Sequence, residues 1–130
     1  MSLIIENLYY SEEHEWVKIE GKNAVIGITD YAQDSLGDVV FIELPKIGDD
    51  FAQMDQIGVV ESVKTVSNIY LPLSGRIIDI NENAIENTAI INSSPYDEGW
   101  LVKIEMYEPS ELEDMLTSEE YEDMLSEDNE

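Results

Sequence analysis

Residues 58–70 read GVVESVKTVSNIY, and the architecture of the chain follows from this stretch. Its valine, isoleucine and tyrosine residues favour the pleated, half-buried backbone of a β-strand. We therefore expect two strands joined by a bend at or near Lys64, where the long stem of the lysine would hold its amine in water. The residues at the bend, Val63-Lys64-Thr65, lack the Asn-Gly or Gly-X pair that marks a two-residue hairpin.

Lys64 is the only positive side chain between Lys46 and Arg76. Composition alone favours a simple role for it, as a gatekeeper on an edge strand that prevents association between sheets. A Schiff-base lysine would need burial or a neighbouring cation to lower its pKa. The nearest charge in the sequence, Glu61, would act in the opposite direction.

The composition indicates a single acidic domain. A chain of 130 residues is long enough for one domain with a modest core, so we expect one domain over residues 1–130. With 6 basic against 30 acidic residues, its formal charge of −24 repels nucleic acid and anionic membrane surfaces, and we expect neither as a partner. The acidity either serves solubility or steers docking onto basic patches of partner proteins.

The chain contains no cysteine, so any sulfur redox chemistry must be supplied from outside the polypeptide. His14 is its single histidine, and the acidic residues never take the spacing of a calcium loop, so we expect no metal. No nucleophile with a matching base stands out, and we do not expect an enzyme. Without a basic leader or a segment long enough to span a bilayer, the sequence predicts a cytoplasmic protein.

Short strands separated by turn signals, roughly every eight to twelve residues, predict a mainly β fold, either a flattened barrel or a barrel-sandwich hybrid. Residues 15–28 are expected to form a hairpin that turns at 21–23, because β-forming runs flank a Gly-Lys-Asn turn. Residues 38–44 are almost continuously apolar, so we expect a buried strand with Val40 in the core. The remaining expected strands cover residues 8–10, 76–80 and 100–104, the last with Trp100 in the core.

Two regions predict helices. A short helix near 30–36 would be capped by Asp30 and ended by Gly37. C-terminal helices near 110–125 would begin at two capping boxes and pack apolar residues on the sheet, whereas the acidic residues 126–130 should fray. Residues 84–92 fit either a helical turn or a loop. The expected capping boxes pair Ser110 with Glu113 and Thr117 with Glu120.

Two long stretches resemble the glycine cleavage system H protein family. One contains Glu61-Ser62-Val63-Lys64, followed by Ser67, Ile69-Tyr70, Pro72 and Ser74-Gly75, and the other runs from residue 27 to 45. The likeness extends over residues 9–121 and includes His14-Glu15-Trp16 and the segment 92–104. It implies that Lys64 carries lipoate through an amide bond, and that Glu61 and Gly75 take part in recognition of the attachment site.

The same resemblance implies a carrier and a set of partner enzymes. Glycine decarboxylase, a pyridoxal-phosphate enzyme, would load an aminomethyl group onto the lipoyl sulfur. A tetrahydrofolate-dependent aminomethyltransferase would unload it, and dihydrolipoamide dehydrogenase would reoxidise the dithiol. A lipoate ligase or a lipoyl synthase would complete the arm.

In this family the loaded arm folds into a surface cleft. By position, Glu15 would face the ammonium group of the arm, with His14 and Asn68 beside the cleft, although composition alone favours a packed, hydrogen-bonded His14. The chain departs from the family pattern at three positions. Asn68 replaces a more frequent aspartate, Glu13 stands where serine can occur, and Thr88 replaces a usual proline, which should loosen its loop.

Three alternatives remain beside the glycine cleavage carrier. Lipoyl domains of 2-oxo acid dehydrogenases typically read Asp-Lys-Ala and biotin carriers Met-Lys-Met, whereas this chain reads Val63-Lys64-Thr65. An H-like protein that relays lipoate to other enzymes would share the whole scaffold. An unmodified interaction module, with Lys64 as a gatekeeper only, belongs to a different class of protein.

Overall fold

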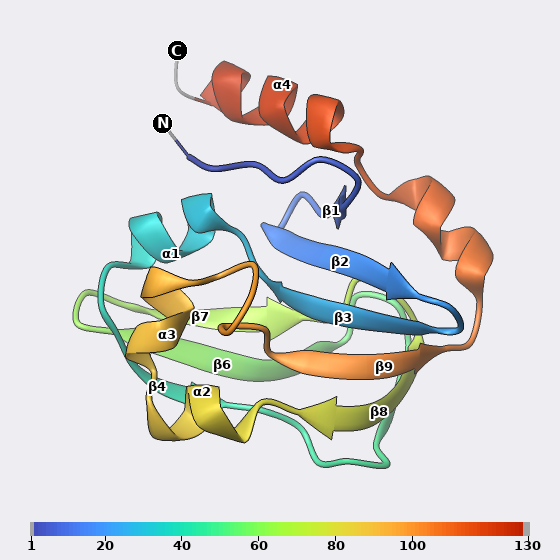
Figure 1. Ribbon diagram of the computed structural model, residues 1–130, viewed down its shortest axis with the longest axis horizontal. Coiled ribbons are helices and arrows are strands. Elements are labelled where there is room, and N and C mark those ends of the chain that lie inside the picture. The colour runs from blue at the N-terminus through green and yellow to red at the C-terminus, as the bar shows by residue number, and fades with distance from the viewer. Residues whose placement is uncertain (1, 129–130) are drawn as a thin grey trace.

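The computed structural model describes residues 2–128 and arranges them as two antiparallel sheets with helices around their edges (Figure 1). The strands are β1 (Tyr9–Tyr10), β2 (Glu15–Glu20), β3 (Asn23–Ile28), β4 (Val39–Glu43), β5 (Asp50–Phe51), β6 (Gln56–Ser62), β7 (Val66–Tyr70), β8 (Gly75–Ile80) and β9 (Val102–Met106). The helices are α1 (Asp30–Leu36), α2 (Glu82–Glu86), α3 (Ala89–Ser93) and α4 (Ser118–Asp128), with a 3-10 helix, η1, at Pro109–Asp114.

The strands form a six-stranded sheet in the order β1-β2-β3-β9-β8-β5 and a three-stranded sheet in the order β4-β6-β7. The prediction of a mainly β fold is confirmed, and of its two forms the sandwich is observed, since the sheets do not join into a closed barrel. The predicted 15–28 hairpin is also confirmed. β2 pairs with β3 from Glu15 opposite Ile28 to Glu20 opposite Asn23, and Gly21 provides the positive φ of the turn, 66°.

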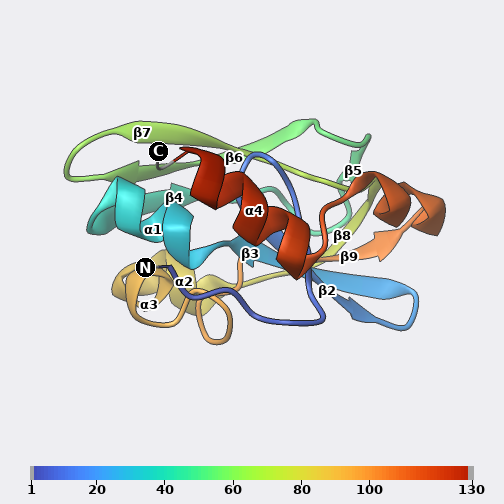
Figure 2. The same ribbon diagram turned by 90° about the horizontal axis from the view of Figure 1, so that it is seen from above.

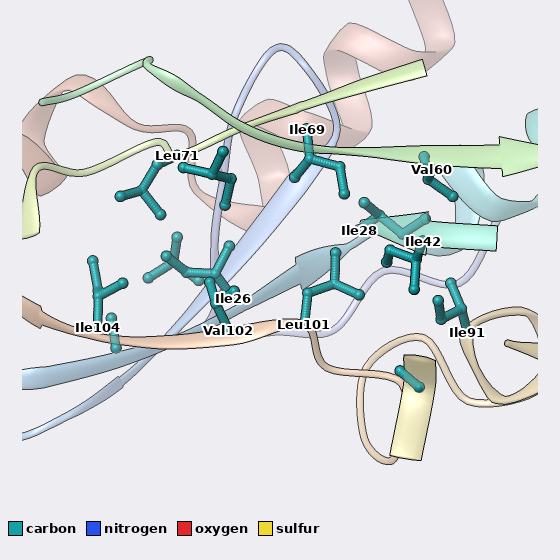
Figure 3. Close-up of a cluster of buried hydrophobic side chains, with 14 of the residues drawn as sticks. Ile26, Ile28, Ile42, Val60, Ile69, Leu71, Ile91, Leu101, Val102 and Ile104 are labelled. Carbon is teal, nitrogen blue, oxygen red and sulfur yellow. The ribbon is translucent and has the colours of Figure 1, made fainter. Parts of the chain in front are cut away.

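The main core lies between the two sheets (Figure 3). Ile26 and Ile104 enter it from the larger sheet, whereas Ile42, Val60 and Ile69 enter it from the smaller one. All five side chains are almost fully buried. Removing such apolar surface from water, at about 25 cal/mol per Å², is the main force that holds the sheets together.

A second cluster lies on the opposite face of the larger sheet and extends to α4, which packs against β1 at the edge of that sheet (Figure 1 and Figure 2). The rings of Tyr10 and Tyr121 stack with centroids 4.6 Å apart, and Leu125 joins them, as the helical spacing predicts. Trp16 packs in the same cluster, with its indole N–H donating to the carbonyl of Pro95 at 2.9 Å. Trp100 is only partly buried at its border, so the prediction of a core tryptophan is only partly met.

The expectation that Val40 lies in the core is wrong. Val40 is 55% exposed, whereas Ile42 on the same strand is 3% exposed. The physical reason is that β4 lies at the edge of the smaller sheet with one face toward solvent, and that its pairing with β6 shifts register between Val39 and Phe41. A bulge of this kind turns a side chain away from the face that its neighbours share.

Two helix starts differ from the sequence prediction. Thr29, not Asp30, caps α1, because its hydroxyl accepts from the backbone N–H of Ala32 at 3.2 Å. Ser110 lies inside η1 and donates to Glu108, so no capping box begins there. The second box is confirmed by reciprocal hydrogen bonds between residues 117 and 120.

Helix α4 extends further than predicted, through Asp128, whereas residues 129 and 130 lie outside the described residues. The ambiguous 84–92 segment covers the second half of α2 and most of α3, so it is largely helical. Between these helices, the hydroxyl of Thr88 donates to the carbonyl of Val39 at 2.7 Å. This hydrogen bond ties the segment to β4 at the position where the sequence predicts a looser loop.

The two faces of β4 can be compared with a matched pair of variants. Ile42→Asp should lower the free energy of unfolding by roughly 4 kcal/mol or more, because it buries an unpaired carboxylate. Val40→Asp should cost less than about 1 kcal/mol, since its carboxylate stays in water. Urea denaturation of both variants measures the difference, and a Val40→Asp variant as unstable as Ile42→Asp would contradict the assigned exposure of β4.

Candidate functional site

Lys64 lies at the exposed tip of the hairpin between β6 and β7, which protrudes at one end of the molecule (Figure 1). The predicted bend at the lysine is therefore confirmed. Val63 and Val66 on either side are 68% and 60% exposed. The amine and both flanking side chains are thus open to a partner protein.

The turn at Lys64 has no Asn-Gly or Gly-X pair, and the side chain of Ser62 stabilises it instead. The hydroxyl oxygen of Ser62 accepts from the backbone N–H groups of Lys64 and Thr65, both at 3.1 Å. The backbone N–H of Ser62 donates to the carbonyl of Thr65 at 2.8 Å. A serine hydroxyl that satisfies the next backbone donors is a recognised substitute for special turn residues. The local signal was therefore present at Ser62, two residues before the lysine.

The turn between α1 and β4 lies against the tip. The backbone N–H of Val63 donates to the carbonyl of Asp38 at 3.0 Å. Gly37 has a positive φ of 77°, and a Cβ added there would lie 3.3 Å from Cε of Lys64. Glycine tolerates this backbone angle, and the stem of Lys64 passes close to it.

A cleft of about 270 Å³ opens directly beside the hairpin. It separates α1 from β7, and half of its lining residues are aliphatic or aromatic, so it offers apolar surface beside polar groups, as expected of a site for an amphipathic ligand. The lining residue nearest to the lysine in the chain is Thr65, which directly follows it. It comprises Glu13, His14, Glu15, Ile28, Tyr31, Ala32, Ser35, Leu36, Val60, Thr65, Val66, Ser67, Asn68 and Ile69.

Glu15 provides a carboxyl group in the wall of this cleft. Its side chain is only 2% exposed, and the hydroxyl of Ser11 donates to its Oε1 at 2.5 Å. Burial raises the pKa of Glu15 to about 7, against the smaller opposing effect of the hydrogen bond from Ser11. Within residues 2–128 the single ion pair joins Arg76 to Asp50, so no described cation neutralises Glu15.

His14 links the cleft to α4. Its Nδ1 lies 2.8 Å from the hydroxyl oxygen of Tyr121, which also lies 2.8 Å from the hydroxyl oxygen of Thr29. The ring of Tyr31 lies 4.7 Å from the imidazole, centroid to centroid. His14 is therefore both a packed, hydrogen-bonded residue and a lining residue of the cleft, so the two interpretations of its sequence position are compatible.

The structure brings some predicted site residues together and separates another. Glu15, His14 and Asn68 all line the cleft, although the amide of Asn68 is bonded to Gln56 at 3.1 Å and to Tyr70 at 3.3 Å. Glu61 lies on β6, opposite Val66 and close to the hairpin tip.

Gly75 is the residue that the structure separates from the others. It lies at the start of β8, in the six-stranded sheet, whereas Lys64 lies between two strands of the three-stranded sheet. A Cβ there would meet the carbonyl oxygen of Glu105 at 2.5 Å. Close packing of β8 against β9 thus accounts for this glycine without any contact to Lys64.

Sequence reasoning missed two residues that shape the cleft. Ser11 is buried and bonds the carboxyl group of Glu15, but its polar connection carries no distinctive pattern. Tyr121 lies in a predicted C-terminal helix, but nothing local shows that its hydroxyl reaches Thr29 and His14, 92 and 107 residues away in the chain.

The described part of the chain shows no group of three or more acidic or histidine side chains placed to hold a metal ion. Among the same residues, no helix has the length and apolar character needed to cross a membrane. The chemistry of the site therefore centres on one exposed amine, one apolar cleft and one buried carboxyl group.

These features define a class of protein, the swinging-arm carriers. Such a carrier needs a stiff body, an exposed amine on a tight bend, and a tether that visits several active sites at high local concentration. The β6–β7 hairpin displays Lys64 in this way.

Comparison with known proteins identifies the family. The family model described as "Glycine cleavage H-protein" matches residues 8–128. Proteins named "Glycine cleavage system H protein" from Carboxydothermus hydrogenoformans and Halothermothrix orenii are 48% and 51% identical to this chain. The first match covers 100% of both chains, and the second covers 94% of this chain and 95% of the relative.

A solved structure agrees with this identification. The crystal structure of a glycine cleavage system H protein from Mycobacterium marinum superposes with a TM-score of 0.86 at 34% identity, covering 95% of this chain and 99% of that one. The chain belongs to the glycine cleavage H-protein family, as residues 27–45 and 61–75 led us to expect.

The raised pKa of Glu15 predicts how stability depends on pH. Between pH 4.5 and about 7 the unfolded state releases this proton while the folded state keeps it, so stability falls as pH rises through that window. Glu15→Gln abolishes the penalty. Its stability relative to wild type, measured by urea denaturation, should therefore increase by about 2 kcal/mol from pH 5 to pH 8.

Glu20→Gln is the matched control, because Glu20 lies at the exposed end of the same strand. Its stability relative to wild type should stay nearly constant over the same pH range. A Glu15→Gln curve that runs parallel to wild type would show that the buried carboxyl titrates normally.

Proposed function

We propose that this protein is the lipoyl-lysine carrier of a glycine cleavage system, and that it shuttles an aminomethyl group from glycine decarboxylase to a tetrahydrofolate-dependent aminomethyltransferase. The observation that carries the proposal is the exposed Lys64 on a fixed hairpin tip, next to an apolar cleft, in a member of this family. In this role the chain is a carrier component and not an enzyme, and residues 1–130 act as a single carrier domain.

Lipoate attached to Lys64 fits the residues present. The amine is exposed, and an amide bond to it would remove its charge. The cleft begins at the next residue and offers apolar walls to an aliphatic chain. When bound, the group would supply the dithiol chemistry that a chain without cysteine lacks.

Glu15 is suited to hold the ammonium group of a loaded arm. A buried carboxyl without a described cation gains most from a positive partner, because the low local polarity strengthens the attraction. Ser11 would orient the carboxylate, and His14 would help to shape the wall. Asn68, in place of a more frequent aspartate, lines the cleft without adding a second negative charge.

The partners follow from the same role. Glycine decarboxylase, the aminomethyltransferase and dihydrolipoamide dehydrogenase would each receive the arm in turn, in the cytoplasm. A lipoate ligase or a lipoyl synthase would complete it, approaching the tip through Glu61 and the exposed valines. The net charge of −24 favours partners with basic docking surfaces. The lipoate-relay alternative is not favoured, since the compared relatives carry the name of the glycine cleavage component.

The attachment site is tested with Lys64→Arg. Wild-type protein incubated with a lipoate ligase, lipoate and ATP should gain one lipoyl group in its intact mass, whereas Lys64→Arg should gain none. The free energy of unfolding of the variant should change by only about 0.5 kcal/mol, because the residue is exposed at a tip. In a reconstituted system only the lipoylated wild type should support glycine decarboxylation. Lipoylated protein that supports no decarboxylation but donates lipoate to another acceptor would restore the relay function.

The role of Glu15 is tested on the loaded carrier. Lipoylated Glu15→Gln should lose its one-carbon group to water about tenfold faster than wild type, because a charge-assisted hydrogen bond to the ammonium is lost. Ammonia release after removal of glycine decarboxylase measures this rate. Glu13→Gln, an exposed change at the rim of the same cleft, serves as the control. Equal rates in wild type and Glu15→Gln would exclude the assigned role.

A further inference from the structure

We propose that Asn92, on α3, is a positioning residue for Lys64. Its side chain holds the turn against which the lysine hairpin rests, and thereby keeps the lysine in the arrangement that an acylating enzyme accepts. The acylation half of this inference rests on the proposed function, whereas the structural half does not.

All the hydrogen-bonding groups of the Asn92 amide are directed at one short segment. The NH₂ group donates to the carbonyl of Gly37 at 2.9 Å and to the side-chain oxygen of Gln33 at 3.0 Å. The carbonyl oxygen accepts from the backbone N–H of Val39 at 2.9 Å. An amide is the side chain that offers two donors and an acceptor in this geometry, so aspartate or alanine cannot replace all three bonds.

The segment that Asn92 holds is the one that touches the lysine tip. Asp38 lies between the two backbone positions bonded to Asn92, and its carbonyl accepts from the backbone N–H of Val63 at 3.0 Å. The stem of Lys64 passes over Gly37, where an added Cβ would lie 3.3 Å from Cε. Residues 37–39 therefore contact Asn92 on one side and the hairpin on the other.

Helix α3 is itself fixed to the protein body. Its Ile91 is fully buried in the core between the sheets, and Thr88 at its start donates to the carbonyl of Val39 at 2.7 Å. Within the described residues, the pairing of β4 with β6 ends at Val39 opposite Ser62, so β4 does not support the part of the hairpin from Val63 to the tip by strand pairing. The bond from Val63 to the 37–39 turn is thus an external support of the tip, and Asn92 connects that support to the core.

The experiment separates positioning from general stability. Asn92→Asp keeps an acceptor for Val39 but loses both donors, and Asn92→Ala loses all three bonds. Ser93→Ala, at the exposed neighbouring position on α3, is the matched control. Ile104→Val is a second control, because it loosens the core without touching the 37–39 turn.

Two quantities are measured on each full-length protein. The first is the hydrogen-exchange rate of the Val63 amide by NMR, with the Leu101 amide, which is bonded to Ile26, as the internal reference. The second is the steady-state acylation of Lys64 by a lipoate ligase at saturating lipoate and ATP. Exchange at Val63 should rise about fivefold or more in both Asn92 variants relative to the Leu101 reference, because a hydrogen-bonded support is lost.

In the acylation assay, KM for this protein should rise roughly threefold to tenfold in the Asn92 variants with kcat unchanged, since a smaller fraction of molecules presents the lysine correctly. Ser93→Ala should leave both KM and the Val63-to-Leu101 exchange ratio at wild-type values, whereas Ile104→Val should leave KM and the Val63 exchange rate unchanged and raise only exchange at Leu101, because it loosens the core. Unchanged Val63 exchange, or an equal rise in KM for Ile104→Val, would overturn the inference. Wild-type protein that is not acylated at all would overturn the proposed function instead, while the exchange measurement would still decide whether Asn92 supports the tip.

Discussion

The structure depends on apolar burial between two antiparallel sheets, and this constraint is what keeps Lys64 in water. Val60 and Ile69 are 2% and 1% exposed, and they fix the β6–β7 hairpin to the core by its inner face. Side chains alternate along a strand, so the register that buries these two residues also places Glu61 on the outer face. The tip extends beyond the core between the sheets, so the amine of a lysine located there stays in water.

The site combines an exposed lysine on a fixed hairpin with a buried carboxyl group that destabilises the folded protein. Burial of the Glu15 carboxyl destabilises the folded chain at neutral pH, because the charged form has lost its water and no described cation replaces it. Ser11 compensates only in part. Under the proposed function, this carboxyl group would hold the ammonium group of a loaded arm. The cleft would then release the arm once its positive charge is lost.

Local patterns predicted most elements, since hairpins and amphipathic helices leave their period in the chain. The bend at Lys64, the turn at Gly21 and the α4 capping box were all correct for this reason. The errors arose where a neighbour outside the local window decides the outcome. Val40 faces solvent because β4 is an edge strand with a bulge, and the position of an edge cannot be read from residues 38–44.

The sequence by itself determined the alternation that makes the sheets, the isolated lysine between two strands, the absence of cysteine, and the family to which these residues point. Only the tertiary structure decided that the 13–15 segment, α1 and β7 enclose a cleft, that Ser11 and Tyr121 support its wall, and that Asn92 reaches the 37–39 turn. The physical reason is one of range. Strand and turn preferences act between residues a few positions apart, whereas these contacts join residues up to 107 positions apart and exist only after the two sheets have closed on their shared core.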